Sequence, residues 1–491
     1  MAKYRPSKRF VWSMTALLPL TVAFYAGFFS ELDNPETPPA KGEITFSSKR
    51  PERGKSSLSS GASSRSSGQS AGFSLNWLNE QYESLMSWEH NPWKRRRASF
   101  GDHYMTLASS KDPYDQARTR ELRRLGAALF QKVLARYPEL AVTFKTVPAE
   151  QNGFLKWLEL CERFEADPSR PGDKGAKELG IPDSLKDALS GKAPWNAADA
   201  KAWLAKEQSI LDELRAIGAL HEQSINGIDV ERWGFISARF AKSCSEALMI
   251  EARLAAEAGD SARALESIAA ARQLADHFGN VETPSLLAVT VQLLLQMQVQ
   301  NYALKELIPT LPPGSVDLAQ WEAALKPVVS PPAEFSRIMR GEWQVGSLQF
   351  VMPMMVDTED PRYPPDPEAL IDFHASMYLD YVSGYDRTSP SDWPAMRAPA
   401  MPAIESMSGS SRDFAELMFV GARAWSNGFQ RAQSNSGMMQ AAFAIMQGQP
   451  IPNDPVYGQS YGWDPATRTL SPPDSPEFKE LQLKPIVVPK L

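Results

Sequence analysis

The sequence has few cysteines. Among its 491 residues there are only two, Cys161 and Cys244. This number excludes a fold built on several disulfides, and neither cysteine belongs to a CxxC pair that could bind zinc or carry out redox chemistry. Both lie among apolar residues at helical spacing. We therefore expect two buried, unreactive thiols, with a disulfide as the alternative in an oxidising compartment.

The sequence also lacks an excess of positive charge. Its 52 Lys and Arg residues are outnumbered by 58 Asp and Glu residues, which gives a formal net charge of −6. Binding to nucleic acid requires a dense positive surface that neutralises phosphates. We therefore expect no nucleic-acid partner.

Common motifs for catalysis, metal binding and nucleotide binding are missing as well. The histidines are scattered and unpaired, so neither an HExxH motif nor a set of histidine and carboxylate ligands can be assembled. No Walker A loop and no GxGxxG motif follows a strand-like run. We assign no catalytic, cofactor-binding or metal-binding residue, and we expect no cofactor. The five histidines are His90, His103, His221, His277 and His374.

One catalytic motif is present, but in an unsuitable context. Residues 458–462 have the pattern G-x-S-x-G, the nucleophile elbow of α/β-hydrolases, which needs a strand before it and a helix after it. Pro452 and Pro455 oppose such a strand, and no histidine follows Ser460 to complete a triad. We predict instead a structural turn that begins at Asn453, because Asx side chains and glycine favour turns.

Methionine offers a further metal hypothesis. Thioether sulfurs could bind Cu(I) outside the cytoplasm, but methionine also fills irregular cores, and these residues follow no repeated motif. We favour packing. The acidic loop at 357–360 lacks the alternating ligands of a calcium loop. The methionines concerned are Met352, Met354, Met355, Met396, Met401 and Met407.

The longest apolar run lies near the N-terminus. Phe10 to Phe29 contains twenty consecutive residues without a charge, and such a helix crosses about 30 Å of hydrocarbon. Basic residues precede the run and acidic residues follow it, so residues 1–9 should be cytoplasmic and the body extracytoplasmic. A cleaved signal peptide is the alternative, but the run is long and lacks an A-x-A site. We predict a single-pass protein of the bacterial inner membrane, anchored by residues 10–29.

The rest of the chain divides by composition. Residues 30–73 are rich in Pro, Ser and Gly and too poor in apolar residues to fold, which predicts a disordered linker. Apolar residues at helical spacing then fill 74–310 and a second region, 311–448, without a series of alternating strand-like runs. The predicted fold class is all-α. Frequent prolines in 449–491 predict an extended tail that lies along the body.

Capping residues and prolines mark several helix starts. The run Leu286 to Val299 is apolar but short and interrupted by Thr and Gln, so it predicts a buried core helix rather than a second membrane span. The expected helices are Asp112 to about Arg136, Asn196 to about Leu220, one that starts at Thr283 and Pro284, and a long one from about Arg412 to Gln447.

A helical hairpin is expected at about residues 244–280. Small residues recur where two antiparallel helices would cross closely, and Gly259 and Asp260 form the turn. This hairpin resembles one tetratricopeptide unit. The following residues do not repeat it, so an ordinary helical hairpin is the alternative.

Several of these features together resemble those of a known group of proteins. The anchor, the hairpin followed by Thr283 and Pro284, and the segment Pro452 to Gly458 resemble a loose group of membrane-anchored, mainly helical bacterial envelope proteins. The last segment is also similar to the P-x-D-P-x-G turn of major pseudopilins of type II secretion. A pseudopilin, however, has its anchor continuous with one long helix, whereas here a linker follows the anchor. The group implies no particular activity.

We therefore expect a non-enzymatic protein of the cell envelope whose helical surface binds another protein, with the identity of that partner left open. An envelope hydrolase with an unrecognised active site is the alternative. A deep pocket that holds two titratable groups in perturbed environments would favour it.

Overall fold

A computed structural model describes residues 100–167, 178–229, 238–326, 333–385 and 422–490, with a few single positions between these ranges. The predicted anchor, the predicted linker and Met396 and Met401 lie outside the described residues. Of the described part, 67% is helix and little is strand, so the mainly helical fold class is confirmed. No helix in this part is long and apolar enough to cross a membrane.

The helices of the N-terminal half begin where capping residues occur. Asp112 accepts a hydrogen bond from the amide of Tyr114 at the start of α5, and Asn196 accepts from two amides at the start of α8. Both predicted starts are confirmed, because these side chains satisfy amides that the helix itself leaves unpaired. The elements of this half are α4 (Asp102–Ser109), α5 (Pro113–Arg136), η2 (Pro138–Leu140), α6 (Gly153–Ala166), α7 (Asp183–Leu189) and α8 (Ala197–Gly218).

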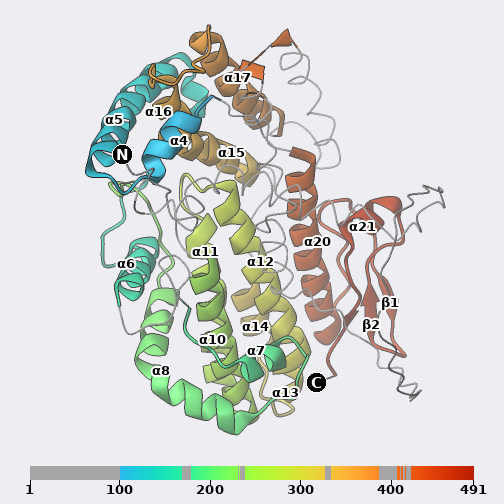
Figure 1. Ribbon diagram of the computed structural model, residues 1–491. Coiled ribbons are helices and arrows are strands. Elements are labelled where there is room, and N and C mark those ends of the chain that lie inside the picture. Colours follow the sequence, from blue (N-terminus) through green and yellow to red (C-terminus); the bar gives the residue numbers. More distant parts are fainter. Residues whose placement is uncertain are drawn as a thin grey trace, which may run out of the picture.

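The expected hairpin is formed by α10 (Ala238–Glu257) and α11 (Ser261–Gly279). Gly259 occupies the turn with a positive φ of 76°, and Asp260 caps α11 by accepting from the amide of Arg263. Alanines on both helices are buried at the crossing, which allows the two backbones to approach closely. The helical hairpin is confirmed, and α12 (Leu286–Tyr302) packs against α11 as a third helix (Figure 1).

The predicted start at Thr283 and Pro284 was wrong by two residues. The hydroxyl of Ser285 caps α12 by accepting from the amide of Ala288. Thr283 is completely buried beside a pocket, and its hydroxyl caps no helix amide. The expectation that Leu286 to Val299 forms a buried core helix is confirmed.

The remaining helices complete two large apolar cores. One core joins α4 and α5 to the start of α12 and to the helices after residue 333. It therefore crosses the expected domain boundary at residue 310. Figure 1 shows these helices gathered at one end of the molecule, with α11 and α12 leading away from them. The elements are η3 (Ala303–Leu307), α13 (Ile308–Thr310), α14 (Leu318–Leu325), α15 (Ala333–Gly346), η4 (Ser347–Val351), α16 (Met352–Met355), α17 (Pro367–Tyr385) and α20 (Ala422–Met446).

Sulfur side chains serve packing in these cores. Met352, Met354 and Met355 are buried in the core around α5, which agrees with the packing interpretation of the methionines. Cys161 and Cys244 are buried and free, and burial raises the pKa of both thiols well above the ordinary value. Two buried, unreactive thiols were expected, and the disulfide alternative does not occur.

The tail docks against the body, as expected, but it also contains a small sheet. Strands β1 (Gly462–Asp464), β2 (Thr469–Ser471) and β3 (Ile486–Val487) pair antiparallel in the order β1-β2-β3, with α21 (Pro476–Leu481) between the last two. Figure 1 places this unit beside α20. Its apolar residues Leu470, Ile486 and Val488 belong to the core around α10 and α11. Strands of two or three residues are too short to be predicted from an alternation of apolar and polar residues.

The turn at Asn453 is structural. Asp454 is buried and accepts hydrogen bonds from the amides of Val456 and Tyr457, and Gly458 has a positive φ of 67°. The hydroxyl of Ser460 donates to the side chain of Asn453. These contacts form an Asx turn in place of a nucleophile elbow.

We predict that Ala264→Leu lowers the free energy of unfolding by about 1 to 3 kcal/mol, because a side chain at a close helix crossing cannot be enlarged without strain. Ala264 is fully buried, whereas Ala262 on the same helix is exposed. Denaturant titration measures the change, and Ala262→Leu is the control. Equal unfolding midpoints for the two variants would contradict the close packing of α10 and α11.

Gly437→Ala should release the tail. A Cβ atom at this position of α20 would overlap the ring of Pro455 and the hydroxyl of Tyr461. The tail has to shift because α20 is held in the core. Limited proteolysis should show faster cleavage after Gly448 than in the native chain, whereas Gln440→Ala on the same helix should leave the rate unchanged. Unaltered cleavage of the Gly437 variant would show that this contact does not hold the tail.

Candidate functional site

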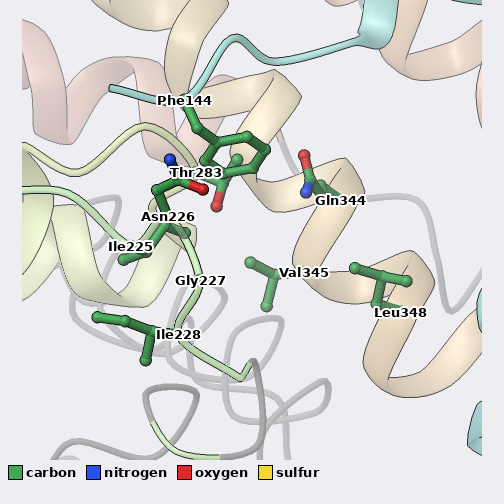
Figure 2. A pocket seen from close by; sticks show the side chains of 9 residues that line it. All are labelled: Phe144, Ile225, Asn226, Gly227, Ile228, Thr283, Gln344, Val345 and Leu348. Atoms are coloured by element: carbon green, nitrogen blue, oxygen red, sulfur yellow. The ribbon is translucent and has the colours of Figure 1, made fainter. Parts of the chain in front are cut away.

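A pocket of about 240 Å³ lies where three segments meet α15 and η4. Figure 2 shows Phe144, Asn226 and Thr283 near one another, with Gln344, Val345 and Leu348 across from them. We call this cavity the Thr283 pocket. Its lining residues are Phe144, Ile225, Asn226, Gly227, Ile228, Thr283, Gln344, Val345 and Leu348.

One wall of the Thr283 pocket is the loop at 222–228. Asn152 holds this loop by donating its side-chain amide to the carbonyl of Ser224 and accepting from the amide of the same residue, at 2.8 and 3.1 Å. Gly227 turns the chain with a positive φ of 75°, which allows the amide of Ile228 to donate to the carbonyl of Ile225. The loop therefore has a defined conformation beside the pocket.

Glu282 joins the loop to the other segments. One carboxylate oxygen accepts from the amide of Lys145 at 2.9 Å and from the hydroxyl of Ser224 at 2.6 Å, and the other accepts from the amide of Ile225 at 3.0 Å. Hydrogen bonds to a charged acceptor are stronger than neutral ones. The neighbours Phe144, Ile225 and Thr283 are thereby fixed around the pocket.

The opposite wall, α15, is fastened to the segment that precedes α12. Arg337 donates to the carbonyls of Gly279 and Val281. Gly341 allows Pro284 to lie directly against the helix, since a Cβ atom there would overlap the Pro284 backbone. Glu342 accepts from the amide of Leu286 at 2.7 Å. Gln344 and Val345, which follow these anchors, are therefore held facing Thr283.

The helix changes its form next to the pocket. Residues Ser347–Val351 form a π-helical turn, η4, which contributes Leu348 to the lining. π-Helical turns within α-helices are rare and occur frequently at functional sites. The irregular turn η4 is therefore part of the wall of the Thr283 pocket.

The chemistry of the pocket is that of a neutral binding site. Five lining residues are apolar: Phe144, Ile225, Ile228, Val345 and Leu348. Among the described residues, none that lines the cavity has an ionisable carboxyl, amino, imidazole or thiol group. The hydroxyl of Thr283 is buried and has no hydrogen-bond partner among the described protein atoms. An occupant with an apolar group would fit the apolar walls, and a polar atom beside that group could pair with the hydroxyl of Thr283.

None of the described histidines lines this pocket. His277 is buried with Nε2 3.0 Å from the carbonyl oxygen of Ile217, and burial lowers its pKa to about 4. His374 is buried beside Ser347, and burial lowers its pKa to about 3. His103 pairs with Asp357 at 2.6 Å near α4. In the described part of the chain, no group of three His, Cys, Asp or Glu residues could hold a metal ion.

A buried polar network lies between α11 and α12. Asp276 accepts from Arg272 at 2.5 Å and from the side-chain amides of Gln292 and Gln296. Burial raises the pKa of Asp276, and the partners oppose that shift. None of its residues lines the Thr283 pocket, and its contacts join α11 to α12, so we assign this network a structural role.

Sequence reasoning did not find the Thr283 pocket, because its parts belong to no motif. Comparison of the chain with models of protein families, with curated proteins and with solved structures found no match. The site therefore has to be interpreted from its own geometry.

We predict that Glu282→Ala destabilises the protein by at least about 2 kcal/mol, because the amides of Lys145 and Ile225 lose their acceptor and the hydroxyl of Ser224 loses one of its two. Urea unfolding measures the loss. Glu222→Ala is the control, since this neighbouring glutamate is exposed and contributes only its backbone to the contacts of the loop. A similar loss of unfolding free energy in both variants would show that Glu282 has no special role in holding the loop.

Glu342 should make stability depend on pH. Burial raises the pKa of Glu342 from 4.5 to about 7. Between these values the folded chain keeps a proton that the unfolded chain has lost, so stability falls as the pH rises from about 4.5 to 7. Glu342→Gln should therefore be stabilising at pH 8 relative to the native chain, by at most about 3 kcal/mol, and nearly neutral at pH 4.

The measurement is urea unfolding of both proteins across this pH range. Other buried groups titrate in the native chain and the variant alike, so the difference between them isolates Glu342. A difference in stability that does not change with pH would contradict the burial of a titrating carboxyl at this position.

Proposed function

We propose that the protein is a non-enzymatic binding protein of the bacterial cell envelope, which captures another protein through the Thr283 pocket. The observation that supports this proposal most directly is a preformed cavity with apolar walls and no ionisable lining group among the described residues. Such a cavity suits the capture of an apolar side chain better than acid or base catalysis, which needs a titratable group at the reacting atoms.

The size and position of the pocket agree with this role. An apolar cavity of about 150 Å³ holds a benzene molecule, so a volume of about 240 Å³ has room for one large apolar side chain. Asn226 and Gly227 are exposed at the edge of the pocket, where a partner can approach. Partner residues that fill a desolvated pocket contribute most to binding energy at interfaces.

The proposal includes the membrane location suggested by the sequence. Residues 10–29 would anchor the chain and residues 30–73 would form a linker, so the body could reach partners near the membrane while remaining concentrated there. The hairpin of α10 and α11 keeps its likeness to a tetratricopeptide unit in this proposal, as part of a helical interaction surface.

Site-specific photocrosslinking of the full chain in its native membranes tests the proposal. A benzophenone amino acid at Asn226, on the edge of the pocket, should give a discrete crosslinked product, whereas the same residue at the exposed Lys201 on α8 should not. Ile228→Trp should fill the pocket and remove the product, and Ile228→Val should retain it. Crosslinking that is absent at Asn226, or equal with Ile228→Trp, would overturn the proposal.

A further inference from the structure

We infer that the Thr283 pocket recognises a neutral peptide segment, with one large apolar side chain inside the pocket and the adjacent peptide groups paired with Thr283, Asn226 and Gln344. This inference rests on the proposed function and states the chemistry of the partner. Free ions, charged side chains and long lipid tails fit the apolar walls and the neutral polar groups of the pocket less well.

The apolar walls determine what enters. Ile225, Val345 and the edge residue Ile228 belong to a small apolar cluster of their own, together with Phe144. Branched aliphatic and aromatic side chains surround the cavity, so an occupant gains by removing apolar surface from water. The limited volume of about 240 Å³ favours a single side chain over an extended acyl chain.

The buried hydroxyl determines what must accompany the apolar group. Thr283 is 0% exposed and its hydroxyl has no hydrogen-bond partner, although it lies at the pocket. Buried polar atoms are nearly always paired in native proteins, so an occupant that offers this hydroxyl an acceptor is favoured over a purely apolar one. A peptide carbonyl next to the inserted side chain can accept its proton.

The remaining polar groups point to a peptide as well. Asn226 and Gln344 both carry an amide, which provides a donor and an acceptor and is therefore complementary to a peptide group. A charged occupant would lose its hydration without meeting an opposite charge among the described lining residues. The set of one hydroxyl and two amides therefore selects a neutral, polar backbone with an apolar side chain.

The test uses the full chain in lipid nanodiscs and capped amino acids as probes. Methyl NMR signals of Ile225, Ile228 and Leu348 report the binding of N-acetyl-leucine methylamide and N-acetyl-phenylalanine methylamide. N-acetyl-glycine methylamide lacks the side chain, and free leucine replaces the peptide groups by charges. At least one of the two capped apolar residues should bind saturably, and both controls should bind at least about tenfold more weakly.

Two variants of Thr283 decide the role of its hydroxyl. Thr283→Val keeps the shape and removes the hydroxyl, so it should weaken binding of the capped apolar residue by about fivefold to tenfold. Thr283→Ser keeps the hydroxyl and should bind nearly as the native chain does. Because the hydroxyl has no partner in the free protein, the valine variant should fold at least as stably, and melting curves check this.

The outcomes separate the inference from the proposed function. Equal binding by the native chain and Thr283→Val, or binding of free leucine as strong as that of capped leucine, would overturn the inference. Specific crosslinking at Asn226 without binding of any capped residue would also overturn it, while leaving the proposed function in place. The absence of both crosslinking and probe binding would refute both.

Discussion

The carboxylate of Glu282 is the interaction on which the candidate site depends. It accepts from the amide of Lys145 and from the amide of Ile225 and the hydroxyl of Ser224, so it joins two segments that are far apart in the sequence. The segments concerned lack helix or strand hydrogen bonds of their own at these points. A buried charge is costly unless it is paired by hydrogen bonds, and here the unpaired amides of irregular segments provide them. The same contacts bring Phe144, Ile225 and Thr283 to one cavity.

This arrangement needs a rigid frame behind it, and α11 and α12 supply that frame. Asp276 couples the two helices by accepting from Arg272 on α11 and from Gln292 and Gln296 on α12. A buried polar network of this kind favours one helix register, whereas a purely apolar contact tolerates sliding. Glu282 lies in the short connection between these helices. Its position is therefore determined by both of them.

Much of the fold could be predicted from the sequence, because local signals determined it. Asp112, Asn196 and Gly259 act within a few residues of their own positions, and the structure uses each as expected. The Asx turn at Asp454 is local in the same sense. The cap before α12 was misplaced because Thr283 and Ser285 have similar local propensity, and only tertiary packing distinguishes them. The three short strands have too few residues for an alternation of apolar and polar side chains to predict them.

The candidate site could not be predicted, because its residues come from four separate parts of the chain. Phe144, Ile228 and Val345 are ordinary apolar residues, and Glu282 belongs to no known motif. The partly exposed edge, the buried hydroxyl and the hydrogen bonds of Glu282 become visible only in three dimensions. A site assembled from residues that are distant in the sequence leaves no regular spacing by which it could be predicted.

The hydrogen bonds of Glu282 hold the pocket walls in place before any partner binds. Hydrogen exchange of the native full chain, resolved at single amides, measures this directly. We expect the amides of Lys145 and Ile225 to exchange slowly, with protection comparable to that of amides within α11, although both lie outside helices and strands. Exchange as fast as that of the exposed loop residue Gly314 would contradict it.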